Sequence, residues 1–327
     1  MKLVHQSAEP LIQFEGIDGL RKKIELAGRT CYKSEDKITE ESAFKFVERL
    51  ENNGHTAMLE HGTVYLTIPL GSPAEDMNYV MVFSIINYFK SNPYSIVKDE
   101  YKIIPVTVIN NREIKTQVHL YHITTNYRVI NEIMQNKIFQ WDEVMVWRVD
   151  TPTVHEKRFT FRLTTSIGIA RELCRHRKFS FAQESTRYCN YTKDKFDNEL
   201  TFIIPYWCTL NKGKYALAED NHYHVFWEGD GYLVSVDETT PENYFLYACH
   251  RAEDMYKIGV NEFNLQPQQA REVLPLGLKT ELIMTGFESD WKQFFDLRYY
   301  EKTGPVHPDM KVLTTIMHDQ LYGDTNN

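Results

Sequence analysis

The densest group of side chains suited to chemistry lies between Arg175 and Tyr188, where the chain reads RHRKFSFAQESTRY. Neighbouring side chains on a helix point about 100° apart, so the Arg-His-Arg run at 175–177 surrounds an anion only if a helix ends there. In an extended chain alternate residues share a face, which groups Gln183, Ser185 and Arg187. An amide, a hydroxyl and a guanidinium on one face can hold a phosphate and contact the edge of a base.

Aromatic neighbours indicate that this segment is partly buried. Phe179, Phe181 and Tyr188 lie among its polar residues. Buried hydrogen-bond donors require acceptors, and a nucleotide would supply them. The alternative is an exposed basic loop with ordinary surface ion pairs.

A second candidate segment reads GHTAMLEH, from Gly54 to His61. Its His55, Glu60 and His61 are residue types that bind metals, but histidines six positions apart with one adjacent glutamate do not match the usual ligand spacing. We therefore expect no metal. The structural alternative is a turn between a helix and a strand, with a histidine near the helix end.

Two arginines stand in short motifs near the carboxyl end. Arg271 lies in AREVLPL at 270–276, which alone indicates a helix stopped by Pro275 with the arginine in a surface pair. Arg298 ends FFDLR at 294–298, and a cation at the C-terminal end of a helix is favourable in any protein. The residues alone leave a binding role and a structural role open for both arginines.

Together these segments resemble the flavin-dependent thymidylate synthase family. That family carries RHR, seven residues, then Ser, with Arg two positions further on and usually Tyr after it, and Arg175–Tyr188 has this spacing. The family's G-H-x-x-x-x-E-H, A-R-x-x-L-P and F-x-x-L-R segments match Gly54–His61, Ala270–Pro275 and Phe294–Arg298 in the same order. Gly28–Tyr32, GRTCY, is a shorter match.

The resemblance implies an activity. Family members convert dUMP to dTMP, with methylenetetrahydrofolate as carbon donor, FAD as hydride carrier and NADPH as hydride source. Because the flavin carries the hydride, the protein mainly has to bind, orient and polarise these ligands. They are homotetramers with active sites between chains. We accordingly expect dUMP, FAD, NADPH and methylenetetrahydrofolate as ligands.

The resemblance also assigns roles to individual residues. The catalytic candidates are Arg298, which would stabilise negative charge on the uracil ring, and Ser185, which we expect to position substrate because no His–Asp pair to activate it is evident. The residues implied to bind substrate are Glu172, Arg175, Gln183, Glu184, Ser185, Thr186, Arg187, Arg271 and Arg298. Those implied to bind the cofactor are His55, Ala57, Arg175, His176, Arg177, Gln183 and Gln293.

Some positions depart from the family pattern. Glu172 replaces the usual Gln, Ala182 replaces an Asn, and Phe287 and Gln293 stand where a flavin-contacting Asn is common. The alternative function is therefore a catalytically altered nucleotide- or RNA-binding protein of the same fold. A net charge of −8 argues against nucleic-acid binding, because phosphate backbones need clustered cations.

The elements that carry these residues mix helix and strand. We expect an α/β (α+β) chain with the family's fold, a mixed sheet with flanking helices, and no Rossmann domain, because only Gly229-Asp230-Gly231, in an expected surface loop, comes near G-x-G-x-x-G. The patterns predict strands at 64–68, 158–163 and 278–285. They predict helices at 16–28, from an N-cap at Thr39 to Gly54, from Ser166 to Arg177, from Thr240 to Ile258, from Pro267 to Pro275, and from Ser289 to Arg298.

The resemblance implies a division of the chain. Residues 1–68 and 157–315 match a catalytic domain, 69–156 are an insertion, and 316–327 are a tail. Five cysteines without C-x-x-C argue against a disulfide framework. Met1–Pro10 has no signal-peptide character, and the chain has no apolar stretch of about eighteen residues, so we expect a soluble cytoplasmic protein with no membrane contact.

Overall fold

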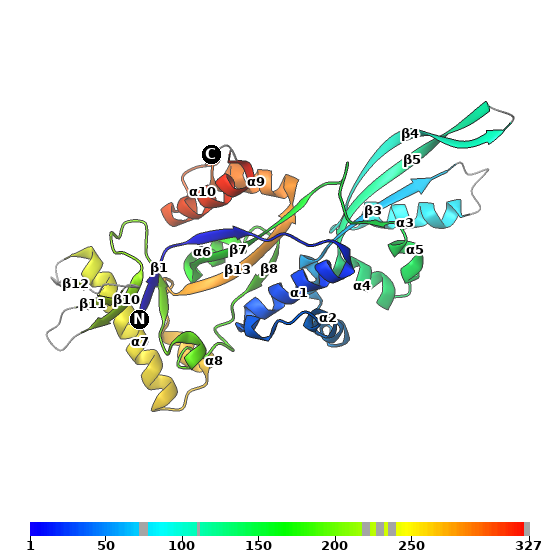
Figure 1. Cartoon of the computed structure of the whole chain (residues 1–327). Helices are drawn as coiled ribbons and strands as arrows, with labels where there is room; N and C mark the ends of the chain where they lie inside the picture. The colour runs from blue at the N-terminus through cyan, green and yellow to red at the C-terminus, as the bar shows by residue number, and fades with distance from the viewer. Residues whose placement is uncertain (72–77, 110–111, 218–222, 227–231, 235–239, 324–327) are drawn as a thin grey trace.

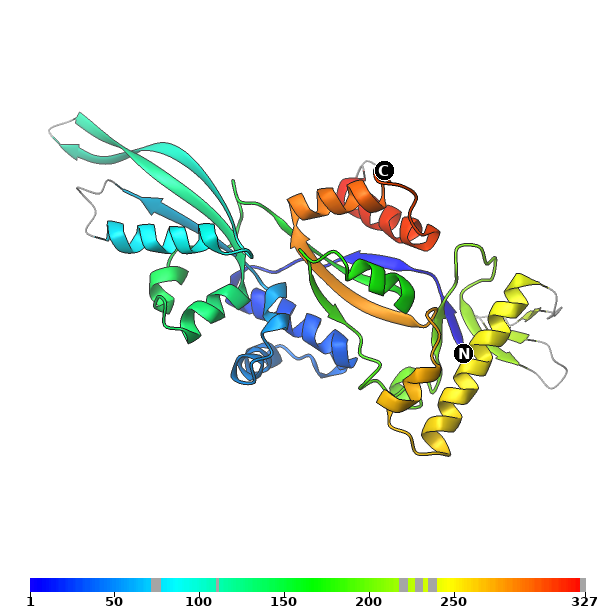
Figure 2. The same cartoon turned by 180° about the vertical axis from the view of Figure 1, so that it is seen from behind.

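The computed structural model describes residues 1–71, 78–109, 112–217, 223–226, 232–234 and 240–323. Over these residues the chain is a mixed α/β molecule with three sheets, which confirms the expected class. The molecule is elongated, with the β4–β5 hairpin at one end and α7 at the other (Figures 1 and 2). Gly229 and Gly231 lie outside the described residues, as do 324–327.

The central sheet positions most of the candidate residues. Its strands, all paired antiparallel, are β2 (Ser7–Pro10), β7 (Arg158–Ser166), β13 (Lys279–Phe287) and β8 (Ser180–Gln183). In β7, Phe161 and Leu163 are buried on one face and Phe159 packs against the same cluster, as the alternation predicts.

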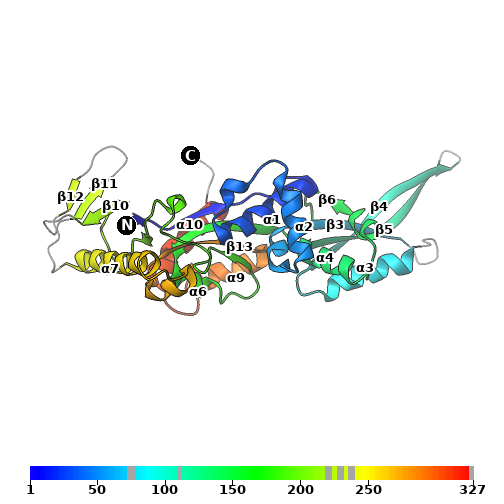
Figure 3. The ribbon, with the colours of Figure 1, turned by 90° about the horizontal axis from the view of Figure 1, so that it is seen from below.

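Helices cover both faces of the central sheet (Figure 3). On one face, Leu163 and Met284 pack with Leu173 and Trp291 in a core formed by α6 (Ile167–Leu173), α9 (Glu288–Arg298) and α10 (Pro308–Tyr322). On the other face, Ala27 of α1 (Gly16–Tyr32) packs against Ala182 and Ile283.

A second sheet lies beyond the amino-terminal end of α1. It consists of β4 (Ile96–Ile109), β5 (Arg112–Asn126), β3 (Thr63–Leu70) and β6 (Arg148–Val149), accompanied by α3 (Tyr79–Ser91), α4 (Tyr127–Gln135) and α5 (Trp141–Met145). One hydrophobic core joins Leu20 of α1 and Val47 of α2 (Ser42–Asn52) to Ile85 and Ile130. Residues 69–156, the expected insertion, thus share a core with the first two helices, and the domain division stays a prediction.

The third sheet contains the amino terminus. Its order is β12 (Tyr232–Val234), β11 (Tyr223–Phe226), β10 (Gly213–Leu217), β1 (Lys2–Val4) and β9 (Thr201–Ile203). The long helix α7 (Pro241–Asn261) follows, capped by Thr240 with Pro241 in its first turn, as the sequence predicts. Next come α8 (Pro267–Ala270) and the 3-10 helix η4 (Arg271–Val273). The other 3-10 helices of the described residues are η1 (Glu35–Lys37), η2 (Thr56–His61) and η3 (Asp194–Phe196).

Several expected helix ends were wrong. Helix α2 begins at Ser42 rather than after Thr39, because the Ser42 hydroxyl accepts from the Thr39 amide and donates to Thr39 and Glu25. Helix α7 does not end at Gly259 but continues to Asn261, and Gly259 lies within the helix next to Leu265 and Ala270. Helix α9 begins at Glu288, and the Ser289 amide donates to the Glu156 carboxylate.

Two further differences affect the site and the carboxyl end. Ser166 does cap α6, but the helix ends at Leu173 rather than Arg177, and a turn leads to β8. Residues 316–322, expected in a tail, form the end of α10, because Leu313 and Met317 are buried in the core beside the central sheet. None of the described helices combines the length and apolar composition needed to cross a membrane.

Candidate functional site

A cavity of about 590 Å³ lies at the end of β8, beside the first turn of α6 and the chain that follows η4. We call it the Arg271 cavity. Its lining residues are Ile167, Arg171, Gln183, Glu184, Ser185, Thr186, Arg271, Glu272, Leu274, Pro275 and Leu276. Most of the polar members belong to the expected substrate-binding set, and they come from segments about 85 residues apart in the sequence.

Backbone hydrogen bonds fix the walls of this cavity. The amides of Ile167 and Gly168 donate to the carbonyls of Leu278 and Leu276, at 2.9 and 3.0 Å, which docks α6 against the chain after η4. The Ser185 amide donates to the Cys31 carbonyl at 2.9 Å, so the end of α1 holds the loop after β8. The short family-like segment at 28–32 therefore lies beside Ser185.

Polar side chains converge inside the cavity. Arg271 donates through Nη1 to the Thr186 hydroxyl at 3.4 Å, and Gln183 donates to the Thr280 hydroxyl at 3.2 Å. The Ser185 hydroxyl accepts from the Arg187 amide at 3.3 Å. Arg187 itself is exposed and does not line the cavity, and its Nε donates to the Gln268 side chain at 3.2 Å. Hydroxyl, amide and guanidinium groups thus surround a space suited to a phosphate and a polar ring.

Arg171 also lines the cavity, and the sequence analysis missed it. No hydrogen bond or ion pair joins its side chain to another described residue. Besides its hydrogen bond to Thr186, Arg271 has a 3.7 Å ion pair with the exposed Glu272. Two guanidinium groups are therefore available to an anion here. The usable signal was that Arg171 lies one helical turn before Arg175.

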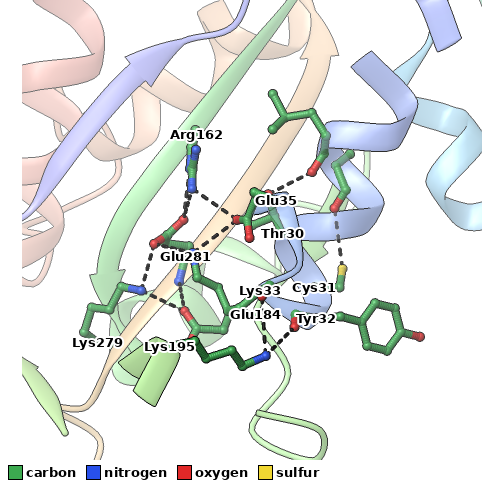
Figure 4. A network of polar contacts seen from close by, with 12 residues as sticks. Thr30, Cys31, Tyr32, Lys33, Glu35, Arg162, Glu184, Lys195, Lys279 and Glu281 are labelled. Atoms are coloured by element: carbon green, nitrogen blue, oxygen red, sulfur yellow. Dashed lines mark hydrogen bonds and ion pairs between the residues drawn. The ribbon is translucent and has the colours of Figure 1, made fainter. Parts of the chain in front are cut away.

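Glu184 belongs to a network of charges rather than facing the cavity freely (Figure 4). Its carboxylate is buried and accepts from the Tyr191 hydroxyl at 3.1 Å and from Lys279 Nζ at 2.8 Å. Lys279 also pairs with Glu281 at 2.8 Å, and Glu281 pairs with Lys33 at 2.8 Å. The carboxylate oxygens of Glu184 are thus engaged inside the protein, where they anchor the loop that carries Ser185.

The charges of this network hold each other ionised. Burial alone raises the pKa of Glu281, but Lys279 and Lys33 outweigh burial and hold that pKa well below its usual range. Burial lowers the pKa of Lys279, and Glu184 and Glu281 reverse the effect and raise it. Arg162 adds contacts to Glu281 at 2.6 Å and to Glu35 at 3.3 Å. The network therefore ties together the end of α1, β7, β13 and the end of β8.

Arg298 lies in a separate group, which we call the Arg298 group, with Glu172 and His176. Arg298 donates through Nε to His176 Nε2 at 3.0 Å, and its Nη1 lies 3.8 Å from the Glu172 carboxylate. Burial and the Arg298 charge lower the pKa of His176 to about 4, so the neutral ring accepts the hydrogen bond. The His176 ring also packs edge-on against the Phe294 ring, and the two ring centres lie 4.9 Å apart.

The candidate cofactor residues are mostly exposed. Arg175 and Arg177 are exposed in the turn after α6, and no hydrogen bond or ion pair joins their side chains to the described residues. His55 and Ala57 are exposed at η2, and Gln293 is exposed on α9, where it accepts from Lys178 at 3.4 Å. The structure does not bring these residues, or the Arg298 group, into the lining of the Arg271 cavity.

The other polar residues of the 54–61 segment have structural contacts. Glu60 accepts from Ser180 at 2.7 Å and from Arg128 at 2.6 Å. His61 is fully buried, and its Nδ1 lies 2.8 Å from the Thr285 hydroxyl. Burial, with Arg158 and Lys23 nearby, lowers the pKa of His61 to about 3. Across the described ranges, no group of three or more His, Cys, Asp or Glu side chains is placed to hold a metal ion.

The cysteines are thiols rather than nucleophilic thiolates. Burial raises the pKa of Cys31 to about 11 and that of Cys189 to about 12. Burial also raises the pKa of the remaining three, Cys174, Cys208 and Cys249. Direct attack of a cysteine on a pyrimidine is therefore disfavoured at neutral pH.

Two departures from the family pattern have local explanations. Ala182 is buried between the central sheet and α1, beside Ala27 and Ile283, where a polar side chain would lack partners. Phe287 is buried beneath the Arg158 guanidinium, which lies 5.2 Å from its ring centre. Neither side chain is free to contact a ligand in this chain.

This chain is similar in sequence to known proteins. A family model described as thymidylate synthase complementing protein matches residues 112–321. A probable flavin-dependent thymidylate synthase of Paramecium bursaria Chlorella virus 1 is 26% identical over 157 residues. That match covers 46% of this chain and 61% of the viral protein, so this chain spans less than two thirds of its relative.

Solved structures show weaker likenesses. Thymidylate synthase X from Helicobacter pylori, solved with FAD and dUMP, is 20% identical, with coverage of 51% of this chain and 68% of that one and a TM-score of 0.34. The UMP/dUMP methylase PolB from Streptomyces cacaoi, bound with 5-Br dUMP, is 14% identical, with coverage of 98% and 92% and a TM-score of 0.40. At such TM-scores neither likeness identifies a residue of this chain's site.

Proposed function

Because the chain belongs to the thymidylate synthase complementing protein family, the family of flavin-dependent thymidylate synthases, we propose that it methylates dUMP to dTMP. The proposed carbon donor is methylenetetrahydrofolate, with FAD as hydride carrier and NADPH as hydride source. In this reaction the protein binds, orients and polarises its ligands. We further propose a cytoplasmic homotetramer.

The observation that carries the proposal is the convergence of Arg171 and Arg271 on one cavity beside Ser185 and Thr186. The dUMP phosphate would lie between the two guanidiniums, which carry the positive charge that a phosphate needs. The Ser185 and Thr186 hydroxyls would donate to phosphate oxygens, and Gln183 would contact the polar edge of uracil. In this assignment Ser185 positions the substrate and does not attack it.

Arg175, Arg177 and His55 fit a large anionic cofactor. The two guanidiniums are exposed and have no partner among the described residues, and two phosphates would give them one. When bound, FAD would supply the hydride chemistry. The exposure of these residues fits a ligand shared with a second copy of the chain, which is the arrangement that a tetramer provides.

Arg298 would act on the ring of the substrate. A guanidinium aimed at the uracil carbonyls stabilises the negative charge that develops when carbon 5 becomes nucleophilic. His176, neutral at pH 7, holds Arg298 through Nε and leaves the outer nitrogens for this role. The Glu172 contact at 3.8 Å is weaker than a direct hydrogen bond and leaves room for a change of partner.

Chromatography of the reaction products tests the proposed activity. The purified chain, stripped of bound flavin and then supplied with dUMP, methylenetetrahydrofolate, NADPH and FAD, should form dTMP, and omission of FAD should abolish the product. Arg251→Ala, an exposed change on α7, serves as the control variant and should be as active as the wild type. Product formation that does not depend on FAD would reject the flavin route.

The pair between Glu172 and Arg298 supports a second candidate, a protein that binds the nucleotide without methylating it. In that case the carboxylate compensates the arginine charge that the reaction needs. Glu172→Gln, which restores the family's usual residue, separates the two functions. Turnover by the wild type supports the enzyme, whereas turnover only in the variant supports the binding protein.

A further inference from the structure

A second cavity, of about 320 Å³, shares no lining residue with the Arg271 cavity. We call it the Lys23 cavity. It is bounded by the chain between β2 and α1, by β3, by the segment from β6 to Pro152 and by the start of β7. The residues that matter below are Lys23, Thr63, Tyr65, Asp150, Lys157 and Arg158.

Two buried cations line this cavity without a carboxylate partner. Lys23 and Arg158 are each only 8% exposed. Arg158 donates to the Thr63 hydroxyl at 3.4 Å and to the Glu60 carbonyl at 3.1 Å, and its Nε has no partner. Among the described residues, none forms a hydrogen bond or an ion pair with the Lys23 ammonium. Buried charges without counter-charges are rare because desolvation is expensive.

The acidic groups near the cavity are already engaged. Asp150 accepts from the Gly16 amide at 2.8 Å and pairs with Arg148. The Glu60 carboxylate accepts from Arg128 and Ser180, and Asp290 pairs with Lys178 at 3.3 Å. Lys157 adds another cation to the lining. The net field inside the cavity is therefore positive.

The pKa values of Lys23 and Arg158 reflect the same lack of a negative counter-charge. Burial, followed by the charge of Arg158, lowers the pKa of Lys23 to about 7. Burial likewise lowers the pKa of Arg158 to about 10. An anion between the two side chains would reverse both shifts by favouring the charged forms.

We propose that the Lys23 cavity binds a small oxyanion, either free phosphate or the carboxylate or phosphate end of a small metabolite. Lys23 would hold the anion directly, the nearby Arg158 charge would attract it, and Thr63 and Tyr65 would add hydroxyl groups. Leu11, Val64 and Phe159 form an apolar wall that accommodates the carbon skeleton of a metabolite. The site is independent of the proposed function, because it shares no lining residue with the Arg271 cavity.

Thermal unfolding of the full chain tests this site with inorganic phosphate and, separately, succinate as probes, at constant ionic strength set with NaCl. The variant is Lys23→Met, which keeps the length of the side chain and removes its charge. The matched control is Lys22→Met, the exposed neighbour on the same helix. Comparison of the two variants isolates this cavity even if phosphate also binds in the Arg271 cavity.

The expected result is a rise of the melting temperature with phosphate or succinate in the wild type and in Lys22→Met, and a much smaller rise in Lys23→Met. A rise in melting temperature with phosphate alone would identify free phosphate as the occupant. A larger rise with succinate than with phosphate would identify a carboxylate metabolite. Without probe, Lys23→Met should be at least as stable as the wild type. Equal responses in the two variants, or no response to either probe in the wild type, would overturn the proposal.

A second measurement follows the Lys23 side chain itself. Reductive 13C-methylation makes the lysines visible by NMR, and the Lys23 signal is the one that is absent from Lys23→Met. Saturating phosphate or succinate should raise the low pKa of Lys23 toward the values of exposed lysines. An unchanged titration would reject the site.

Discussion

At the scale of single residues, Arg271 and Arg298 differ in how their charges are compensated. Arg271 faces the neutral Thr186 hydroxyl and a cavity, with Glu272 only at 3.7 Å. Arg298 is held by His176 and lies 3.8 Å from Glu172. In the proposed reaction, the charge of Arg271 would bind an anion in the ground state, and the charge of Arg298 would stabilise negative charge that develops in the transition state.

Replacement of Arg271 should weaken substrate binding. We expect Arg271→Ala to raise the dissociation constant for dUMP by about tenfold or more, because a charge-assisted hydrogen bond is worth roughly 1.5–3 kcal/mol. Isothermal titration calorimetry measures this change. Arg251→Ala on α7 is the control and should bind like the wild type. An unchanged dissociation constant in Arg271→Ala would move the phosphate site elsewhere.

Replacement of Arg298 should affect turnover rather than cofactor retention. We expect Arg298→Ala to keep its flavin and to lose about 10²–10³-fold in kcat, the usual effect of removing one charge-stabilising donor. Steady-state kinetics, together with the flavin content, measures both quantities. Lys292→Ala, an exposed change on the same helix, is the control. Full turnover in Arg298→Ala would remove this residue from the mechanism.

Much of the candidate site at this scale was predictable from the family resemblance. Gln183, Ser185, Thr186 and Arg271 were named from the sequence, and the structure brings them to one cavity. Arg171 was not named from the sequence, although it lies one helical turn before Arg175, and the lack of a partner for its charge among the described residues is visible only in the structure. The Glu184 carboxylate was expected to face substrate, but its neighbours Tyr191 and Lys279 come from remote segments that no local pattern reveals.

At the scale of elements, the charge network holds the loop after β8 in place. It joins the end of α1 to β7 and β13 through Lys33, Arg162 and Lys279, with Glu281 at its centre (Figure 4). The same loop is bound through its backbone, since the Glu184 amide donates to the Glu281 carbonyl at 2.8 Å. The position of Ser185 thus depends on contacts across three elements.

Removal of Lys279 should destabilise the fold. Lys279→Met leaves the buried Glu184 carboxylate without its cation, and we expect a loss of about 3 kcal/mol in the free energy of unfolding. Urea denaturation measures the loss. Addition of Glu184→Gln should recover part of it, because the uncompensated charge disappears. Lys214→Met, a change at an exposed pair, is the control, and a loss no larger than in that control would contradict the account.

Element types were predicted better than their ends. The strands at 64–68, 158–163 and 278–285 and the Thr240–Pro241 helix start are present, because alternation and capping are local signals. The start of α2 was missed because Ser42 bonds to Glu25, a residue of another helix. The start of α9 was missed because the Ser289 amide is satisfied by Glu156. Both ends are set by tertiary contacts.

At the scale of the whole molecule, buried groups link the core beneath α1 to the central sheet. His61 reaches Thr285 of β13, and that hydroxyl lies 2.9 Å from Thr160 of β7. The hydrophobic core beside His61 contains residues of α1, α2, α3 and α4. The sequence analysis did not predict this shared core, because none of the motifs that it identified lies within residues 69–156.

The buried His61 should make stability depend on pH. Burial lowers its pKa from 6.5 to about 3, so the unfolded chain binds a proton between these values and the folded chain does not. The contribution of His61 to stability is therefore fully present above pH 6.5 and is lost as the pH falls from 6.5 toward 3, by about 1.4 kcal/mol per pH unit in that window.

Chemical denaturation at several pH values between 7.5 and 5 measures this dependence. His61→Asn should show a shallower decline than the wild type, while His55→Asn, a change at an exposed position, should show the same decline as the wild type. Buried histidines elsewhere act equally in all three proteins, so the comparison isolates His61. Parallel declines in all three proteins would contradict the assignment.

The absorbance of bound flavin during a titration with dUMP tests the central claim most directly. The account predicts that the purified chain retains or takes up FAD and that dUMP changes the flavin spectrum saturably, with a weakened response in Arg271→Ala. A chain that takes up no flavin after incubation with FAD, or a flavin spectrum that dUMP leaves unchanged, would contradict a flavin-dependent thymidylate synthase.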